Sequence, residues 1–174
     1  DEAGYLNLSK LWLNNTSIVI HSIIDRMQLQ YSNDKLDIRL GRQRINWGIH
    51  NFWNPNDLFN TFNFLDFDLE ERPGSDAMRI QYFTNGGSTL EAAFKPGKKS
   101  DNHTGGLLYK FNHSGYDFQM LGGIYNTDFV FGGGWAGGIN KTGWKGEFSY
   151  FIPYKNQINS KQVFVFTSMV DQTF

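Results

Sequence analysis

Three arginines lie close together in the sequence, at Arg39, Arg42 and Arg44, and a further arginine of interest lies at Arg79. A guanidinium binds a carboxylate or phosphate through two parallel hydrogen bonds, so arginine suits sites that hold anions. An acidic run lies between these arginines: Asp66, Asp68, Glu70 and Glu71. Acids set against arginines across a water-filled passage would produce a transverse field that selects solutes by charge. The alternative is that these charges form ordinary ion pairs that fix a loop.

No catalytic or cofactor-binding pattern accompanies these charges. The chain has no cysteine, and its 4 histidines show none of the spacings of metal sites. Glu70 and Glu71 project to opposite sides of an extended chain, so they make a poor acid–base pair. The glycines at 132–134 lack the Lys-Ser/Thr of a phosphate-binding loop. We expect them instead to leave room in the lumen or to permit sharp curvature of the strand. We therefore expect no enzyme activity, no metal and no cofactor.

Composition narrows the class of protein. The 174 residues suit a single domain, and the formal net charge of −1 does not favour a nucleic-acid partner. Aromatic residues make up 17% of the chain although its mean hydropathy is −0.46. No apolar run is long enough for a transmembrane helix. The opening "DEAGYLNLSK" does not resemble a signal peptide, so we expect a mature form, a fragment or a cytosolic protein.

The elements that carry these charges are predicted to be β-strands. Apolar and polar residues alternate with period two along the chain, and the pattern of an amphipathic helix is almost absent. Charged residues lie in mid-strand on the polar face: Asp37, Arg39, Arg79, Glu91, Lys110, Asp117, Lys145 and Glu147. The sequence predicts an all-β protein of about ten strands, at 5–13, 18–31, 36–43, 77–83, 89–95, 106–112, 116–125, 129–139, 144–150 and 161–174.

The links between these strands largely alternate in length. Short links rich in Asn, Gly and Ser lie at 32–35, 85–88, 112–115 and 140–143. The other links are mostly longer, at 48–75, 95–102 and 152–161, with a short exception at 126–128. This alternation predicts an antiparallel up-and-down arrangement with short turns at one end and long loops at the other. Outer-membrane barrels have this plan.

Alternation alone does not say which face of such strands points inward. A soluble barrel places its apolar residues inside, whereas a membrane barrel turns them outward against lipid. Three features favour the membrane barrel: aromatic residues near strand ends, mid-strand charges of both signs on the opposite face, and strand lengths that match a tilted bilayer span. The alternative is a soluble β-barrel or sandwich that binds a glycan or lipid.

The segment "RLGRQRINWG", followed by "FWNPNDLFN" and "EERPGSDAMRIQY", resembles a motif run in porin-like outer-membrane β-barrels of Gram-negative bacteria, near the alginate-export and Bacteroidetes porin-like groups. The resemblance covers residues 36–82. It implies a bacterial outer-membrane location, contact with outer-membrane lipid, and passive passage of small polar solutes, among them anionic or saccharide ones. Such families usually have longer chains, which implies a larger barrel, a homo-oligomer or a larger outer-membrane assembly. A non-conducting structural barrel is a further alternative.

Within this interpretation, the side chains expected to line the lumen or its constriction are Arg39, Arg42, Arg44, Arg79, Asp66, Asp68, Glu70, Glu71, Glu91, Lys110, Asp117, Lys145 and Glu147. Arg39 and Arg79 share the polar face if their strands are neighbours. Arg42 and Arg44 share it only if a bulge occurs at Gly41, and otherwise they lie where the strand ends. We expect the 48–75 loop to be held by anchors at Trp47, Phe52, Trp53 and Pro55.

Overall fold

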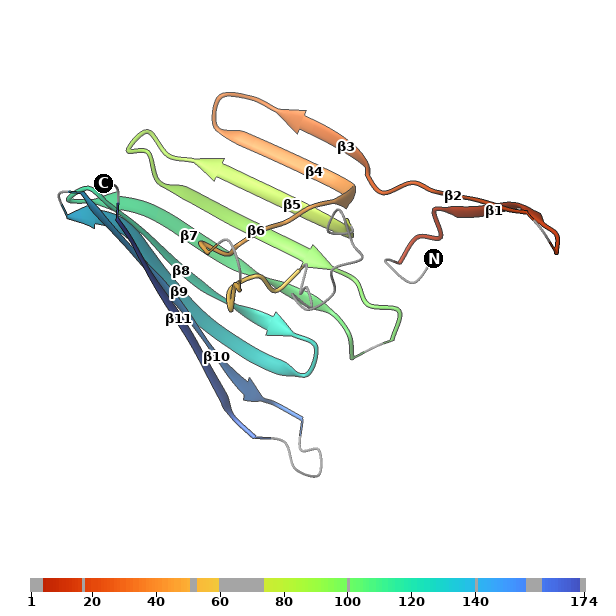
Figure 1. Ribbon diagram of the computed structural model, residues 1–174. Helices are drawn as coiled ribbons and strands as arrows, with labels where there is room; N and C mark the ends of the chain where they lie inside the picture. The colour runs from red at the N-terminus through yellow and green to blue at the C-terminus, as the bar shows by residue number, and fades with distance from the viewer. Residues whose placement is uncertain are drawn as a thin grey trace.

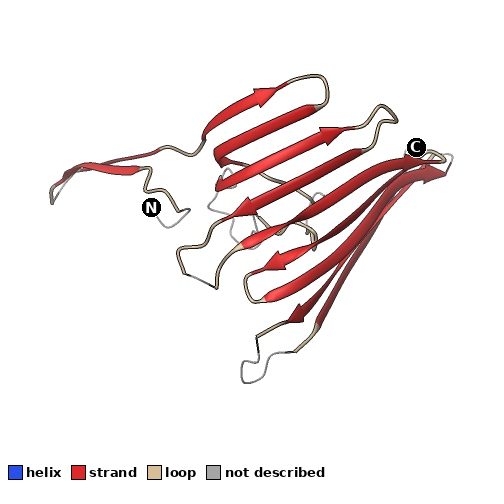
Figure 2. Ribbon diagram, turned by 180° about the vertical axis from the view of Figure 1, so that it is seen from behind, coloured by secondary structure: helices blue, strands red, loops and turns tan. Residues whose placement is uncertain are grey.

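The computed structural model describes residues 5–16, 18–50, 53–59, 74–99, 101–139, 141–155 and 161–172. The regular structure in these ranges consists of 11 antiparallel strands without a helix (Figure 2), which confirms the all-β prediction. The strands are β1 (Ser9–Asn14), β2 (Val19–Ile23), β3 (Met27–Ser32), β4 (Leu36–Gln43), β5 (Ser75–Phe83), β6 (Thr89–Lys95), β7 (Thr104–His113), β8 (Tyr116–Tyr125), β9 (Asp128–Ile139), β10 (Thr142–Pro153) and β11 (Val163–Gln172). No helix that could cross a membrane occurs in the described ranges.

One large sheet contains β3 to β11 in chain order, so each strand pairs with the strand that follows it. This 9-stranded meander confirms the predicted up-and-down arrangement. The predicted closed barrel is not observed: within the described residues the sheet ends at β3 on one side and at β11 on the other. Figure 1 shows the sheet curling from β3 to β11 around the segment that follows β4.

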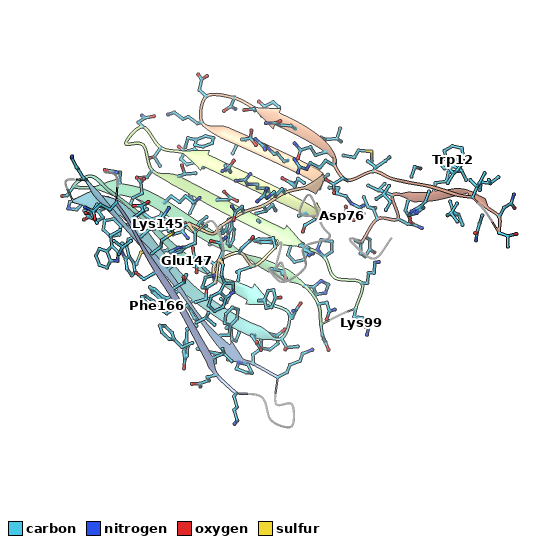
Figure 3. All side chains as sticks on the ribbon, viewed as in Figure 1. Trp12, Asp76, Lys99, Lys145, Glu147 and Phe166 are labelled. Atoms are coloured by element: carbon cyan, nitrogen blue, oxygen red, sulfur yellow. The ribbon has the colours of Figure 1, made fainter. Side chains whose placement is uncertain are left out.

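A separate hairpin of β1 and β2 extends away from the large sheet, and Figure 3 shows its side chains, Trp12 among them, projecting beyond that sheet. The sequence predicted one strand over 18–31, but the chain forms β2 and β3 with a break at residues 24–26. Asp25 and Arg26 lie in this break and form an ion pair of 3.3 Å. The break lets β2 pair with β1 while β3 pairs with β4.

The two faces of the large sheet differ in chemistry. The outer face, as we call it, carries large apolar side chains that are exposed: Leu29, Tyr31, Leu40, Met78, Tyr82, Leu90, Phe94, Leu107, Tyr109, Met120, Ile124, Phe129, Phe131, Trp144, Phe148, Phe164, Phe166 and Val170. The inner face carries Asp37, Arg39, Arg79, Glu91, Gln119 and Glu147, most of them buried. Buried polar groups beneath exposed apolar ones invert the arrangement usual in water-soluble domains.

Two alternatives were expected here, a bulge at Gly41 or the end of the strand. Pairing between β4 and its neighbours runs without interruption through Gly41, so the bulge is wrong, and β4 ends at Gln43. Gly41 is needed for another reason. Its φ is 125°, and a Cβ at this position would lie 2.4 Å from the carbonyl oxygen of Met27 on β3. Without a bulge, Arg42 lies on the outer face rather than the inner one.

Arg42 forms a buried ion pair with Asp76, its cross-strand partner on β5. Its Nε donates to Asp76 Oδ1 at 2.8 Å, and its Nη2 donates to Asp76 Oδ2 at 3.1 Å. The same guanidinium donates to the carbonyl oxygens of Leu6 and Ile24, and the Leu6 N–H donates to Asp76. The pair therefore fastens the N-terminal segment to the end of the large sheet, and its predicted place in a lumen is wrong.

Replacing Arg42 with Ala leaves Asp76 as a buried charge without its guanidinium, so we expect the free energy of unfolding to fall by about 3–5 kcal/mol. Arg44→Ala is the matched control, because Arg44 is exposed just beyond β4 and should change stability by less than about 0.5 kcal/mol. Denaturant-induced unfolding measures both. Equal losses in the two variants would contradict the structural role assigned to the Arg42–Asp76 pair.

Candidate functional site

The inner face of the sheet is covered by residues 44–59, which we call the strap; residues 51 and 52 within it are not described. The strap leaves the end of β4 and runs across the strands. Trp47 donates from its indole N–H to Glu91 of β6, and the Ile49 N–H donates to Glu147 of β10. The strap therefore crosses the inner face from β6 to β10 before it turns.

The return limb of the strap also lies against the sheet. Asn56 Nδ2 donates to the carbonyl oxygen of Gly133 at 3.0 Å, and Ser149 Oγ donates to the carbonyl oxygen of Pro55 at 2.9 Å. At its end, the carbonyl oxygen of Phe59 accepts hydrogen bonds from Ser75 Oγ of β5 and Lys95 Nζ of β6. Both ends of the strap are thus held near the same strands.

Register explains the path of the outgoing limb. Cross-strand pairing aligns one row of inner-face residues across β7 to β11: Lys110, Gln119, Gly134, Glu147 and Thr167. The strap follows this row, because Gln119 donates to the carbonyl oxygen of Trp47 at 2.7 Å and Glu147 accepts from Ile49 at 2.7 Å. Polar side chains of the sheet thus satisfy backbone groups of the irregular strap, as buried backbone requires.

Trp47 of the strap is held by burial, a hydrogen bond and an aromatic contact. It is fully buried, its indole N–H lies 2.7 Å from Glu91 Oε1, and its ring meets the edge of Phe59 at a centroid distance of 4.8 Å. Glu91 itself also accepts two hydrogen bonds from Arg79, at 2.7 and 2.8 Å, and one from Gln81 at 2.9 Å. One carboxylate therefore joins β5, β6 and the strap.

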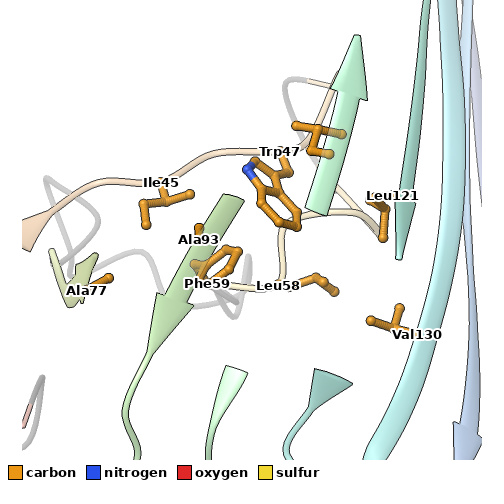
Figure 4. Close-up of a cluster of buried hydrophobic side chains, with 9 residues drawn as sticks. Ile45, Trp47, Leu58, Phe59, Ala77, Ala93, Leu121 and Val130 are labelled. Atoms are coloured by element: carbon orange, nitrogen blue, oxygen red, sulfur yellow. The ribbon is translucent and has the colours of Figure 1, made fainter. Parts of the chain in front are cut away.

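The hydrophobic core lies between the strap and the inner face (Figure 4). The strap contributes Ile45, Trp47, Leu58 and Phe59, and the sheet contributes Ala77, Ala93, Leu108, Leu121 and Val130. These sheet residues are small or aliphatic, and they lie on the inner face between its charged residues. The core is therefore an internal one, distinct from the exposed apolar outer face.

Glycines of β9 make room for the strap. A Cβ at Gly134 would lie 2.6 Å from Ile49 Cδ1, and a Cβ at Gly132 would lie 2.6 Å from Asn56 Oδ1. The room that the sequence predicted beside these glycines is thus occupied by the strap. Any side chain at either position would push the strap away from the sheet or require the sheet to shift.

Arg39 and Arg79 are direct cross-strand partners on the inner face, as expected if their strands were neighbours. Each guanidinium already holds a carboxylate of the sheet. Arg39 Nε lies 2.8 Å from Asp37 Oδ1, and Arg79 binds both oxygens of Glu91. The predicted acidic partners Asp66, Asp68, Glu70 and Glu71 lie outside the described residues. The arginines are thus part of an ion-paired ladder, and Arg39 is the more exposed, at 30% of its side chain against 15% for Arg79.

Four more of the predicted lining residues are on the inner face: Lys110, Asp117, Lys145 and Glu147. Lys110 and Asp117, with Gly48, Ile49 and Gln119, border a hollow of about 250 Å³ beside the strap. Lys145 and Glu147 lie further along the sheet, on β10 (Figure 3). Burial and the charge of Lys145 lower the pKa of His50 in the strap, so its imidazole is neutral near pH 7.

Only some of the residues predicted to anchor the loop do so in the structure. Trp47 and Pro55 are buried, whereas Trp53 is 51% exposed and does not anchor the strap, and Phe52 lies outside the described residues. Arg44 is exposed and lies just beyond β4, at the start of the strap. The sequence prediction omitted Asn56, Gln119 and Ser149. Alternation places Gln119 and Ser149 on the polar face, but no sequence signal matches them with strap residues.

Trp47→Phe keeps an aromatic ring but removes the hydrogen bond to Glu91. We expect a loss of about 1.5–3 kcal/mol in the free energy of unfolding, because that bond is buried and its acceptor is charged. Trp53→Phe removes an exposed indole of the same strap and should leave stability unchanged. Denaturant-induced unfolding of the pair checks the assignment, which a larger effect of Trp53→Phe would contradict.

Comparison with known proteins identifies no relative: no family model matches the chain, and neither a curated protein nor a solved structure matches it. The likeness to porin-like barrels therefore stays a prediction from sequence motifs.

Proposed function

We propose that this chain forms wall strands of a β-barrel in a bacterial outer membrane and serves as a porin-like channel for small polar solutes. The observation that carries the proposal is the inverted chemistry of the sheet, whose outer face exposes large apolar side chains while its inner face buries charge. Lipid is the solvent that favours such an outer face, and a water-filled interior tolerates such an inner one.

Strand length supports the same proposal. The strands from β4 to β11 have 7 to 12 residues, which is close to the span of a tilted strand across a bilayer. Aromatic residues lie at or near several strand ends on the outer face, among them Tyr82, Tyr116 and Trp144. Side chains of this kind favour the interface between hydrocarbon and water.

A membrane location also requires that the sheet be closed. The outer edges of β3 and β11 have no strand partner among the described residues, and unpaired backbone groups are costly in hydrocarbon. In the proposed barrel, further strands pair with both edges, so the complete barrel has more strands than the 9 of this sheet. A larger barrel, a homo-oligomer or a larger outer-membrane assembly would each supply them.

Within the barrel, the strap narrows the passage and solutes move past the side of the strap that faces away from the sheet. Arg39 has the most accessible guanidinium of the ion-paired ladder, and Lys110 borders the hollow beside the strap. These cations give the passage a modest preference for anionic solutes, and the polar inner face also suits uncharged polar solutes such as saccharides. The strap itself gives reason for a second candidate, a non-conducting structural barrel, because it already occupies much of the inner face.

Reconstitution distinguishes these candidates. We expect the full chain to need detergent to stay in solution and to produce discrete conductance steps in planar bilayers. A protein that is monomeric in water without detergent would favour the soluble glycan- or lipid-binding alternative. A membrane-inserted protein that never conducts would overturn the channel and leave the structural barrel.

Charge reversal tests the passage more closely. Arg39→Glu should raise the cation-to-anion permeability ratio by at least about twofold, since it replaces a cation on the inner face with an anion. Arg79 is less suitable, because its loss would also disturb Glu91 and Trp47. Arg26→Glu, in the break between β2 and β3, is the control. Reversal potentials in a salt gradient report the ratio, and no difference between the two variants would count against the proposed path.

A further inference from the structure

The hollow of about 250 Å³ beside the strap contains two opposite charges. One is the ammonium of Lys110 on β7, and the other is the carboxylate of Asp117 on β8. The rest of the lining carries no charge and consists of Gly48, Ile49, Gly87, Phe111, Phe118 and Gln119. A molecule in this hollow therefore meets one cation and one anion.

Cross-strand register keeps the two charges apart. Lys110 pairs with Gln119, and Asn112 pairs with Asp117, so Lys110 and Asp117 are diagonal neighbours on the inner face. Positions of this kind lie about 7–8 Å apart. Within the described ranges, the two side chains form no ion pair with one another or with any other residue. The hollow thus holds two separated charges rather than a closed salt bridge.

Neighbouring protein groups hold these charges without pairing with them. Glu91 attracts the Lys110 ammonium and Arg79 repels it. The oxygens of Glu91 already accept four hydrogen bonds from other side chains. Asn112 donates to Asp117 Oδ1 at 2.9 Å, and the other oxygen of that carboxylate has no hydrogen-bond partner in the described part of the chain. Both charges therefore keep the capacity to bind a ligand.

We propose that this hollow binds a small zwitterionic solute of the α-amino acid class, with its carboxylate on Lys110 and its ammonium on Asp117. A simple anion or cation would be attracted by one of these charges and repelled by the other, whereas a zwitterion satisfies both. The groups that hydrogen-bond the two ends of an α-amino acid lie about 8 Å apart. The flexible lysine side chain can match this spacing. The volume of the hollow lies just below that of drug-sized sites and suits a small solute.

Such a site deepens the proposed function and rests on it, since the solute reaches the hollow through the passage beside the strap. Two partly exposed ion pairs are weak interactions, so we expect a Kd of about 1–10 mM. Weak binding suits a passage, because a solute that binds there must also leave.

Ligand-observed saturation-transfer NMR tests the site on the full chain in detergent micelles, at low ionic strength because salt screens exposed charges. Three ligands of matched shape separate the two charges: L-alanine, propionate, which lacks the ammonium, and ethylamine, which lacks the carboxylate. We expect saturable binding of L-alanine. Propionate and ethylamine should each bind at least about threefold more weakly, because each loses one ion pair.

Variants assign each end of the ligand to its partner. Lys110→Met removes the ammonium but keeps an unbranched side chain, and it should weaken binding of L-alanine and propionate but not of ethylamine. Asp117→Asn should weaken binding of L-alanine and ethylamine but not of propionate. Lys145→Met is the matched control, because Lys145 is another half-buried lysine of the inner face and lies outside the hollow. It should bind L-alanine as the wild type does.

No saturable binding of L-alanine up to about 50 mM, well above the expected range, would overturn the proposal. Propionate that binds as tightly as L-alanine would make the hollow a simple anion site and overturn it too. Equal weakening by Lys145→Met would mean that the general charge of the inner face attracts the ligand, which also contradicts the site. Circular dichroism verifies the fold of each variant, and the comparison of the three ligands on the wild type needs no variant.

Binding in micelles requires no conduction, so the two proposals fail separately. L-alanine binding by a chain that never conducts would support the site and overturn the channel. A conducting chain that binds no L-alanine would support the channel and overturn the site.

Discussion

The carboxylate of Glu91 is the interaction on which the inner face depends. It is 1% exposed and receives hydrogen bonds from Arg79, Gln81 and the indole of Trp47. Because a buried charge is tolerated only with partners, these donors and the strap must be in place together. Glu91 therefore links the ion pairs of the sheet to the strap, which has no regular secondary structure of its own.

The same coupling gives the sheet its unusual division of faces. The strap supplies the internal core with Ile45, Trp47, Leu58 and Phe59, so the outer apolar residues are not needed to fill the interior. They remain exposed on the outer face, where a lipid environment would stabilise them. Most of the charges that would be costly in lipid lie on the opposite face, and the Arg42–Asp76 pair of the outer face is buried. This division is what the proposed function rests on.

Arg42 shows how strongly position decides the role of a charge. It is only three residues from Arg39, yet it lies on the outer face and forms a buried pair with Asp76. Arg39 lies on the inner face beside Asp37 and is partly exposed. Arg42 holds the N-terminal segment in place, while Arg39 keeps part of its guanidinium exposed, as the proposed passage requires.

The sequence by itself determined most of the strands and which side chains share a face, because a period of two places alternate side chains on opposite sides whatever the strand contacts. It was sufficient to place Arg39 and Arg79 together and to assign Glu91, Lys110 and Glu147 to one face. Only the tertiary structure decided that Gly41 forms no bulge, that Trp47 rather than Trp53 anchors the strap, and that Asn56 rests on Gly132 and Gly133. These contacts join residues far apart in the chain, and local patterns contain no information about which distant polar group satisfies a given backbone or side-chain atom.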